Sequence, residues 1–499
     1  MSASLPKDLL RAQFVGKTLH QVGTPALVLD LAKVEANCNL MLEAAQRLQL
    51  SWRAHIKTHK TEELTRLQVG DDNSLPVNII VSTIIEGESV LPLLKEYQEK
   101  GRQVNVLYSF PIYGSSVARL AALSSALGPR ALSVMVDHPD QLKHLTSLAS
   151  KSGHPPLVFL KVNVGTNRAG VVPGSAACRE LLDDLLIAES TGSCVLLGLY
   201  CHAGHSYAAR RDWEAMGILG AEFAALEDVA ALVRKERPGH PLVLSVGATP
   251  TATTLQHPDF SQPQPQQQGS EPGANGEKTA SAVEASLLTS APTSRLKELI
   301  SRMRAADLTL EVHAGVYPTL DVQQLAAHAR DAAYLNWRAI GVSVLADVAS
   351  LYPGRGAGDS STEALVNAGC LALGREPCQD MGGPTGESYN AWGILMPWNG
   401  LANPTPGPEF PAVHGGWQVA RISQEHGVLR WAGPGGEEGG GESEGKGKEA
   451  PLHVGQRVRI WPNHSCITGA GHGWYLVVDS RNQGREDEIV DVWPRWNGW

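Results

Sequence analysis

The chain lacks the excess of positive charge that a protein needs to bind nucleic acids or anionic lipids. It has 42 lysines and arginines against 51 aspartates and glutamates, which gives a formal net charge of -9, and the basic residues are scattered. A polyanion partner needs basic residues clustered on one face. We therefore expect neither nucleic acid nor a membrane among the partners of this chain.

Long hydrophobic runs are also lacking. No stretch approaches the roughly 18 apolar residues that span a bilayer, and residues 1–20 have no continuous apolar core of the kind found in secretory signals. The seven cysteines form an odd set without C-x-x-C spacing, which argues against a structural zinc site and against a secreted disulfide framework. These absences predict a cytoplasmic protein.

Several common catalytic motifs are missing as well. The sequence contains no G-x-S-x-G turn, no phosphate-binding loop of the nucleoside triphosphatase type and no obvious pair of carboxylates. Hydrolase and triphosphatase functions lose support for this reason. At 499 residues the chain exceeds the usual size of one domain, so two domains are expected.

Short β-rich runs alternate with segments of helical periodicity over the first two thirds of the chain. Apolar residues recur at helical spacing in the connecting segments, for example in 90–100 and 216–236. Strand and helix alternating eight times predict a parallel (β/α)8 barrel. The expected strands are 51–57, 79–82, 104–108, 132–136, 158–164, 195–200, 242–246 and 308–313.

After residue 330 the strand-like runs follow one another mostly without helices, which predicts a mainly β second domain. Two compositionally biased tracts interrupt the pattern. Residues 256–295, rich in Gln, Pro, Ser and Gly, are expected to form a disordered insertion, and residues 433–450 a flexible loop.

Polar residues follow the expected barrel strands. Reactive groups of (β/α)8 barrels collect where the strands end, so the last residues of each strand are the natural candidates. Such a set suits a small, anionic, aromatic ligand. The candidates are Lys57, Ser82 with Thr83, Tyr108, Asp137, Arg168, Tyr200 with His202, Thr249, and His313 with Gly315.

The stretch R-A-H-I-K-T-H-K-T (53–61) interleaves two lysines with two histidines. A lysine at the mouth of a barrel is desolvated and close to other cations, so its pKa is expected to fall and its amine to become nucleophilic, which suits imine chemistry. The alternative is a solvated turn with incidental neighbours, and this stretch alone favours that alternative. Other stretches decide between the two.

Two glycine-containing turns follow the last two expected barrel strands. S-V-G-A-T-P-T (245–251) and V-H-A-G-V-Y (312–317) lie where barrels commonly hold a phosphate group with backbone N–H groups and a hydroxyl. In P-N-H-S-C-I-T (462–468), His464 and Cys466 are two positions apart and could both coordinate a zinc ion. Two protein ligands would leave other coordination positions of the zinc open, as in catalytic sites. A buried cysteine beside a surface histidine is the alternative that spacing alone leaves open.

Taken together, these stretches resemble the D-serine dehydratase and D-threonine aldolase family of pyridoxal-phosphate (PLP) enzymes, which have the alanine-racemase-like fold. The resemblance covers most of residues 22–499 apart from the two biased tracts. The stretches that carry it are T-P-A-L-V-L-D (24–30), 53–61, V-S-T-I-I-E (81–86), K-V-N-V-G-T-N-R-A-G-V (161–171), G-L-Y-C-H-A-G-H-S-Y (198–207), 245–251, S-Q-E-H-G (423–427) and P-N-H-S-C (462–466).

The resemblance implies a domain plan and a role for each motif residue. Residues 22–30 would join the β domain, 31–325 would form the PLP barrel, and 326–499 would form the β domain that carries the metal. Lys57 would bind the cofactor covalently, with Lys60 as a neighbour, and His464 with Cys466 would bind Zn²⁺. The remaining cofactor-binding residues would be Arg168, Tyr200, His202, Tyr207, Thr249, Gly315 and Val316.

Three positions depart from the family pattern. Ala54 stands where proline is usual, Asn163 where aspartate is usual, and Val316 where asparagine is usual. The last change removes a side-chain amide near the phosphate, although backbone N–H groups could still hold that phosphate.

The activity that the resemblance implies is the zinc-assisted dehydration of D-serine to pyruvate and ammonia by a homodimer. D-threonine aldolase, which cleaves D-β-hydroxy amino acids to glycine and an aldehyde, is the nearest alternative. Cys466 favours the dehydratase because a thiolate prefers zinc, whereas the aldolases commonly use a harder cation held by a carboxylate. A PLP-homeostasis protein without turnover is a third reading, and a racemase is disfavoured because no second base is evident.

Overall fold

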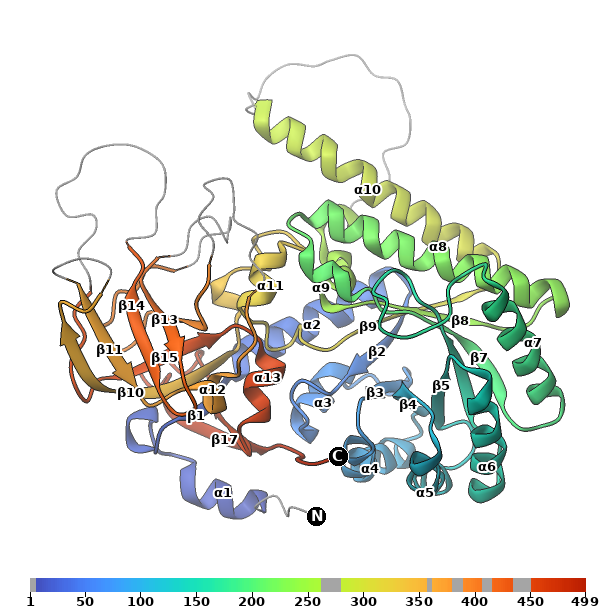
Figure 1. The fold of residues 1–499 in the computed structure, drawn as a ribbon, viewed down its shortest axis with the longest axis horizontal. Helices are drawn as coiled ribbons and strands as arrows, with labels where there is room; N and C mark the ends of the chain where they lie inside the picture. The colour runs from blue at the N-terminus through green and yellow to red at the C-terminus, as the bar shows by residue number, and fades with distance from the viewer. Residues whose placement is uncertain (1–5, 262–279, 357–360, 379–388, 406–414, 434–449) are drawn as a thin grey trace.

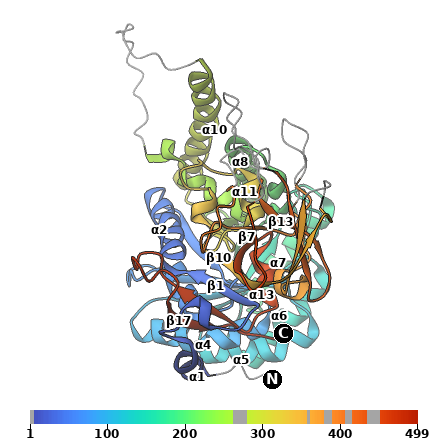
Figure 2. The same cartoon turned by 90° about the vertical axis from the view of Figure 1, so that its left-hand side faces the viewer.

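The computed structural model describes residues 6–261, 280–356, 361–378, 389–405, 415–433 and 450–499. Figure 1 shows two domains side by side, a barrel wrapped in helices on the right and a mainly antiparallel sheet on the left. In the view turned by 90°, helices α13 (Ser465–Ala470) and α11 (Val322–Ala327) lie near the middle of the molecule (Figure 2). The tract 433–450, expected to be flexible, lies almost entirely outside the described residues.

The barrel consists of eight parallel strands in sequential order, closed by pairing of the last strand with the first. This confirms the predicted fold. Two strands end earlier than expected, at His55 and Lys161, so the residues that follow them belong to turns. The strands are β2 (Ser51–His55), β3 (Val77–Val81), β4 (Val104–Pro111), β5 (Leu132–Val136), β6 (Leu157–Lys161), β7 (Val195–Tyr200), β8 (Val243–Val246) and β9 (Thr309–Ala314).

The helices that cover the barrel begin and end where the local sequence dictates. Thr61 caps α3, since its hydroxyl accepts a hydrogen bond from the Leu64 N–H, and Gly70 ends that helix at a φ of 65°. The outer helices are α2 (Leu31–Arg47), α3 (Glu62–Val69), α4 (Ile84–Glu99), α5 (Val117–Leu127), α6 (Leu142–Ser152), α7 (Ala176–Ser190), α8 (Asp212–Glu236) and α10 (Ala280–Ala305), with the short α9 (Thr249–Thr253) after β8.

The tract predicted to be disordered, 256–295, is ordered at both of its ends, which corrects that prediction. Gln256 is buried and accepts a hydrogen bond from Arg330, and a 3-10 turn spans Pro258–Ser261. Helix α10 begins at Ala280 and packs along α8, as Figure 1 shows. Its carboxyl half has Leu296, Ile300 and Met303 buried at helical spacing, which composition alone does not reveal. Residues 262–279 lie outside the described part.

The second domain is built on a nine-stranded sheet whose order is β11-β14-β13-β12-β15-β10-β1-β16-β17. Strand β1 is antiparallel to β10 and parallel to β16, so the first strand of the chain lies deep in the domain formed by its last third. The strands are β1 (Ala26–Asp30), β10 (Val342–Pro353), β11 (Thr362–Val366), β12 (Gly393–Leu395), β13 (Trp417–Ile422), β14 (Gly427–Trp431), β15 (Arg457–Pro462), β16 (Trp474–Val478) and β17 (Ile489–Pro494).

Helix α1 (Lys7–Phe14) packs against β17, where Lys7 and Arg11 both pair with Asp491. The seven cysteines are free thiols. Among the described residues, no helix is both long and apolar enough to cross a bilayer.

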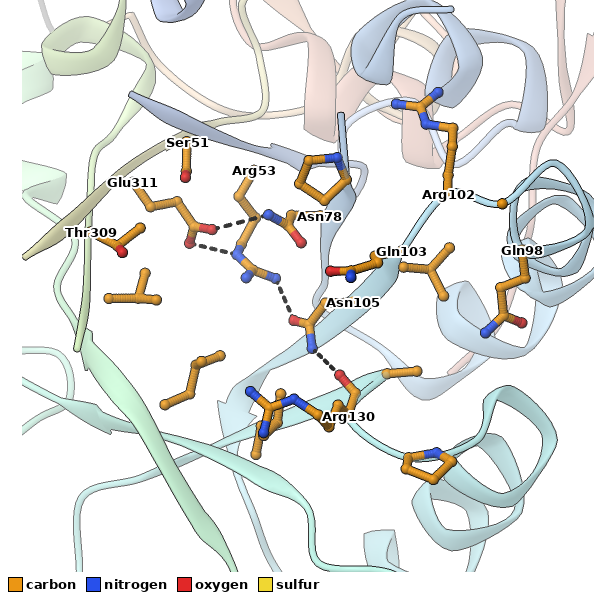
Figure 3. A pocket seen from close by; sticks show the side chains of 18 residues that line it. Ser51, Arg53, Asn78, Gln98, Arg102, Gln103, Asn105, Arg130, Thr309 and Glu311 are labelled. Carbon is orange, nitrogen blue, oxygen red and sulfur yellow. Dashed lines mark hydrogen bonds and ion pairs between the residues drawn. The ribbon is translucent and has the colours of Figure 1, made fainter. Parts of the chain in front are cut away.

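A polar network crosses the amino end of the barrel (Figure 3) and borders a cavity of about 590 Å³. The buried guanidinium of Arg53 donates from Nε to Glu311 Oε1 at 2.6 Å and from Nη1 to Asn105 Oδ1 at 2.8 Å. Asn105 in turn donates to the carbonyl of Arg130 at 3.1 Å and accepts from the Ser133 hydroxyl at 2.9 Å. These partners come from four different strands and their loops, so the network ties the strands together.

Candidate functional site

A second cavity, of about 270 Å³, lies at the carboxyl ends of the barrel strands, where the barrel meets α13. Seven of the residues to which the family resemblance assigns a role line this cavity, and they come from both domains, whereas Ser82, Thr83 and Tyr108 line a different cavity. The seven are Lys57, Arg168, His202, Tyr207, Val316, His464 and Cys466. The fold therefore brings together Lys57 and Cys466, which are 409 positions apart in the sequence.

Tyr200, Thr249 and Gly315 do not line the cavity, although Thr249 is bonded to Val316, which does. The Thr249 hydroxyl accepts a hydrogen bond from the backbone N–H of Val316 at 3.0 Å, so the two glycine-containing turns touch. Gly315 approaches the β2 end so closely that an added Cβ would lie 3.1 Å from the His55 carbonyl oxygen. Tyr200 is buried and stacks on His313 with ring centroids 4.3 Å apart.

The two lysines of the 53–61 stretch differ in their surroundings. Lys60 adopts a positive φ of 51° and its ammonium pairs with Glu86 at 3.1 Å. The Lys57 amine lines the cavity, and its Nζ has no hydrogen bond or ion pair among the described residues. His59 is fully buried and bonded to Gln68 at 2.9 Å. Of this stretch, Lys57 is thus the side chain left free to react in the cavity.

The turn that carries Lys57 is held from behind by the β domain. Arg495, at the end of β17, donates from Nε to the His59 carbonyl at 3.0 Å and from Nη2 to the Thr58 carbonyl at 3.3 Å. The backbone N–H of Trp496 donates to the Lys60 carbonyl at 2.8 Å. The second domain therefore fixes the backbone that directly follows Lys57, and no bond from it reaches the Lys57 amine among the described residues.

His202 is held in one tautomer. Its Nδ1 lies 2.8 Å from the Gly247 carbonyl, which can only accept, so Nδ1 carries the proton and Nε2 is left as an acceptor. Burial, together with the charges of Lys161 and Lys57, lowers the pKa of His202 to about 3. The ring is therefore neutral at physiological pH.

Two buried ionisable residues that sequence reasoning missed support this end of the barrel. Glu222 on α8 accepts hydrogen bonds from the backbone N–H groups of Ala203 at 2.9 Å and Gly247 at 3.2 Å, and burial raises its pKa to about 7. The Lys161 ammonium lies 4.3 Å from the centroid of the Tyr200 ring, and burial lowers its pKa to about 8. Glu222 thereby links the loops that follow β7 and β8.

The loop that leads to Arg168 is shaped by Asn163, one of the departures from the family pattern. The Asn163 side-chain oxygen accepts hydrogen bonds from the backbone N–H groups of Gly165 and Asn167, both at 3.1 Å. Its amide donates to the Asn167 side chain at 2.9 Å. Asparagine and aspartate both have a side-chain oxygen that can accept these two bonds, so this departure from the family pattern preserves the turn.

His464 and Cys466 lie at the start of α13, next to the Lys57 turn. Cys466 Sγ is 3.1 Å from the Thr58 hydroxyl. His464 Nδ1 is buried and has no hydrogen-bond partner among the described residues. Burial opposes charge on both side chains, but contact between them lowers the pKa of the Cys466 thiol and raises the pKa of His464 to about 9.

The start of α13 is fixed by Asp321, which is fully buried. Its carboxylate accepts from the backbone N–H of Ser465 and from that of Gln324, each at 2.9 Å. Asp321 therefore joins α11 of the barrel side to the segment that carries His464 and Cys466. No pattern in the sequence connects these residues.

Four further residues line the cavity without having been predicted. They are Gly204, Gln323, Glu376 and Cys378. Gly204 lies inside a quoted motif, G-L-Y-C-H-A-G-H-S-Y, and could have been found there. The other three come from segments without any recognisable motif, and only the packing of the β domain on the barrel brings them to the site.

Two family models match the chain. The model described as "Alanine racemase, N-terminal domain" matches residues 29–264, and the model described as "Putative serine dehydratase domain" matches residues 341–478. The first covers most of the barrel, and the second covers most of the sheet together with α13.

Curated relatives match over nearly the whole chain. The D-serine dehydratase of Schizosaccharomyces pombe is 35% identical over 99% of this chain and 96% of its own length. The D-serine dehydratase of Saccharomyces cerevisiae is 29% identical over 98% and 99%, respectively.

Among solved structures, D-threo-3-hydroxyaspartate dehydratase from Delftia shares the fold, with a TM-score of 0.67 and 23% identity over 97% of this chain and 100% of the other. Structures of two of its variants are similar to this chain as well. In one, a cysteine is replaced by alanine and the protein is in the metal-free form; in the other, a histidine two positions earlier is replaced by alanine.

Proposed function

The chain belongs to the D-serine dehydratase family, and from that premise we propose that it is a zinc-assisted, PLP-dependent lyase that converts D-serine to pyruvate and ammonia. The observation that carries the proposal is the Lys57 amine, which lines the cavity at the carboxyl ends of the barrel strands without a partner of its own. A free amine at that place is what a covalently bound aldehyde cofactor requires.

The residues around the cavity fit pyridoxal phosphate. Lys57 would hold the aldehyde carbon, Arg168 would approach the phenolic oxygen, and His202 would lie against the ring, while Tyr200 supports this end of the barrel through its stack on His313. The Thr249 hydroxyl, Tyr207 and the backbone N–H of Gly315 would hold the phosphate, with the Val316 N–H bonded to the Thr249 hydroxyl. The close approach of Gly315 to the β2 end supports this reading, because a side chain there would crowd the turn of Lys57.

Pyridoxal phosphate, when bound, supplies an electron sink for the charge that develops on the α-carbon of the substrate. The chain itself supplies the base, since the Lys57 amine can take the α-proton at Nζ. Arg495 and the Trp496 N–H keep the backbone of that turn in place while the side chain moves. His202 stays neutral and can orient the bound ring through Nε2 without adding charge.

His464 and Cys466 fit a zinc ion. A buried imidazole nitrogen without a partner and a thiol whose pKa is lowered are the donors that zinc prefers. Zinc, when bound, supplies a Lewis acid for the departing β-hydroxyl. The Delftia dehydratase supports this assignment, because replacing a cysteine two positions after a histidine accompanies its metal-free form. Thr58 contacts Cys466 and is adjacent to Lys57, so it would hold the metal ligands in a fixed position relative to the lysine.

The experiment that tests the proposal separates dehydration from aldol cleavage. Purified protein is incubated with D-serine and with D-threonine, and keto acid is assayed against glycine plus aldehyde. We expect pyruvate from D-serine, formed far more slowly after a chelator is added. Glycine as the main product would establish the aldolase instead, and no turnover of any D-β-hydroxy amino acid would favour a role in cofactor homeostasis.

We also propose that the chain forms a homodimer. Phe110, near the end of β4, and Tyr113, just after it, are about half exposed and stack edge to face with centroids 5.9 Å apart. Exposed aromatic pairs of this kind are common where protein surfaces meet. Analytical ultracentrifugation at micromolar concentration would give twice the mass of one chain if the proposal holds, and the mass of one chain if it does not.

A further inference from the structure

Glu376 places a carboxylate beside the predicted metal pair. It lines the same cavity as Lys57 and Cys466, and its Oε1 lies 3.9 Å from His464 Nδ1. The side chain is 47% exposed, so it borders the entrance rather than the floor.

The backbone around Glu376 is anchored. The Asn463 amide donates to the Glu376 carbonyl at 3.2 Å, and the Gln323 amide donates to the next carbonyl, that of Pro377, at 2.9 Å. Asn463 and Gln323 belong to the segments that precede α13 and form α11, which also fix the metal pair. The carboxylate is thus kept at the metal side of the cavity.

The charge of Glu376 has no lysine or arginine partner among the described residues. The cationic side chains that line the cavity are Lys57 and Arg168, and the proposed function assigns both of them to the cofactor. His464 would be a metal ligand. Among the described residues, the imidazole of His464 is therefore the one cationic partner of Glu376, and the wall at the metal side of the cavity carries a carboxylate.

We propose that Glu376 determines substrate specificity by excluding D-β-hydroxy amino acids that carry a second carboxylate and admitting those with an uncharged β-substituent. The inference rests on the proposed function, in which the metal pair binds the β-hydroxyl. A carboxylate on the same β-carbon, as in 3-hydroxyaspartate, would then lie close to Glu376. Two like charges a few ångströms apart in a half-exposed cleft repel each other enough to change affinity by roughly three- to tenfold.

Glu376 could instead serve as a third metal ligand, and the geometry speaks against that. In the part of the chain that the structure describes, no group of three or more histidine, cysteine, aspartate or glutamate side chains is placed to hold a metal ion. The zinc content of a Glu376→Gln variant separates the two roles, because a ligand would lower it and a specificity determinant would not.

The test uses D-aspartate and D-asparagine, which have the same shape and differ by one negative charge. Neither carries a β-hydroxyl, so neither can be dehydrated, and binding to the holoenzyme is followed by the change in cofactor absorbance. The dissociation constants are compared in the wild type, in Glu376→Gln and in Glu425→Gln. The last is a matched control that removes one carboxylate from the exposed turn before β14.

We expect the wild type to bind D-asparagine more tightly than D-aspartate. That preference should shrink about three- to tenfold in Glu376→Gln, should stay unchanged in Glu425→Gln, and should weaken with added salt in the wild type. Glu376→Lys should reverse the preference. An unchanged ratio in Glu376→Gln, or loss of zinc from that variant, would overturn the inference. Absence of pyruvate from D-serine would instead count against the proposed function. The binding comparison does not depend on turnover, so the two failures can be told apart.

Discussion

The two ends of the barrel are both rich in polar side chains, but the hydrogen bonding of these side chains differs between the ends. At the amino end, Arg53, Glu311, Asn105 and Ser133 are bonded to one another. At the carboxyl end, the amine of Lys57 is unpaired, and the buried ring nitrogens His313 Nε2 and His464 Nδ1 have no hydrogen-bond partner among the described residues. Buried polar groups normally form hydrogen bonds. The carboxyl end, where some do not, is therefore the end suited to bind a ligand.

Replacing Lys57 by alanine should give the largest effect. The variant loses both the attachment point of the cofactor and the base, so pyruvate formation from D-serine should fall about ten-thousandfold or more. The measurement is the initial rate together with borohydride trapping and peptide mapping. Lys60→Arg keeps the charge beside Glu86 and should retain most of the activity. An equal loss in both variants would mean that the two lysines were wrongly told apart.

At the amino end, the Arg53→Met replacement should act on stability alone. Glu311 would be left buried and unpaired, which typically costs about 3–5 kcal/mol of unfolding free energy. Chemical denaturation measures the loss, and Arg53→Met combined with Glu311→Gln should recover part of it. The KM for D-serine should not change in either variant. A changed KM with unaltered stability would assign this network to the active site instead.

Removal of the metal should lower the rate of dehydration while leaving the fold intact. We expect Cys466→Ala to lose zinc and to form pyruvate about a hundredfold more slowly, as the wild type should after treatment with a chelator. Cys370→Ser, which changes a thiol outside the cavity, serves as the control. A Cys466→Ala variant with full activity and no bound zinc would rule out the metal from this step.

His59 lies in the same stretch as Lys57, but its ring is buried and hydrogen-bonded, like the side chains at the amino end. It should therefore influence the unfolding free energy. Burial, with a smaller contribution from the charge of Arg495, lowers its pKa to about 3. The unfolded chain therefore binds a proton that the folded chain does not as the pH falls below about 6.5. The unfolding free energy should drop by about 1.4 kcal/mol per pH unit for this histidine.

The contribution of His59 can be isolated by denaturation curves at pH 7, 6 and 5. His59→Asn removes the titrating ring, so the slope of stability against pH should be shallower by one proton than that of the wild type. Identical slopes would mean that His59 is protonated in the folded protein as well.

The barrel could be predicted from the sequence because hydrophobic runs of strand length alternate with helical periodicity, and each expected barrel strand overlaps an observed one. Lys57 was placed on a strand, but β2 ends at His55, and a hydrophobic pattern cannot locate such an end. Arg495, Asp321 and Glu376 were missed for a different reason. They reach the site only when the sheet packs on the barrel, and no local sequence pattern records that contact.

The position of β1 has a consequence for how the chain must assemble. Its neighbours in the sheet, β10 and β16, are synthesised long after it, on the order of a minute later for β16 at ~5–20 residues per second. Until then, both edges of the Leu27–Leu29 segment remain unpaired outside the ribosome. This segment is fully buried in the folded protein. We expect nascent chains stalled before residue 340 to recruit chaperones at this segment even when their barrel has already closed.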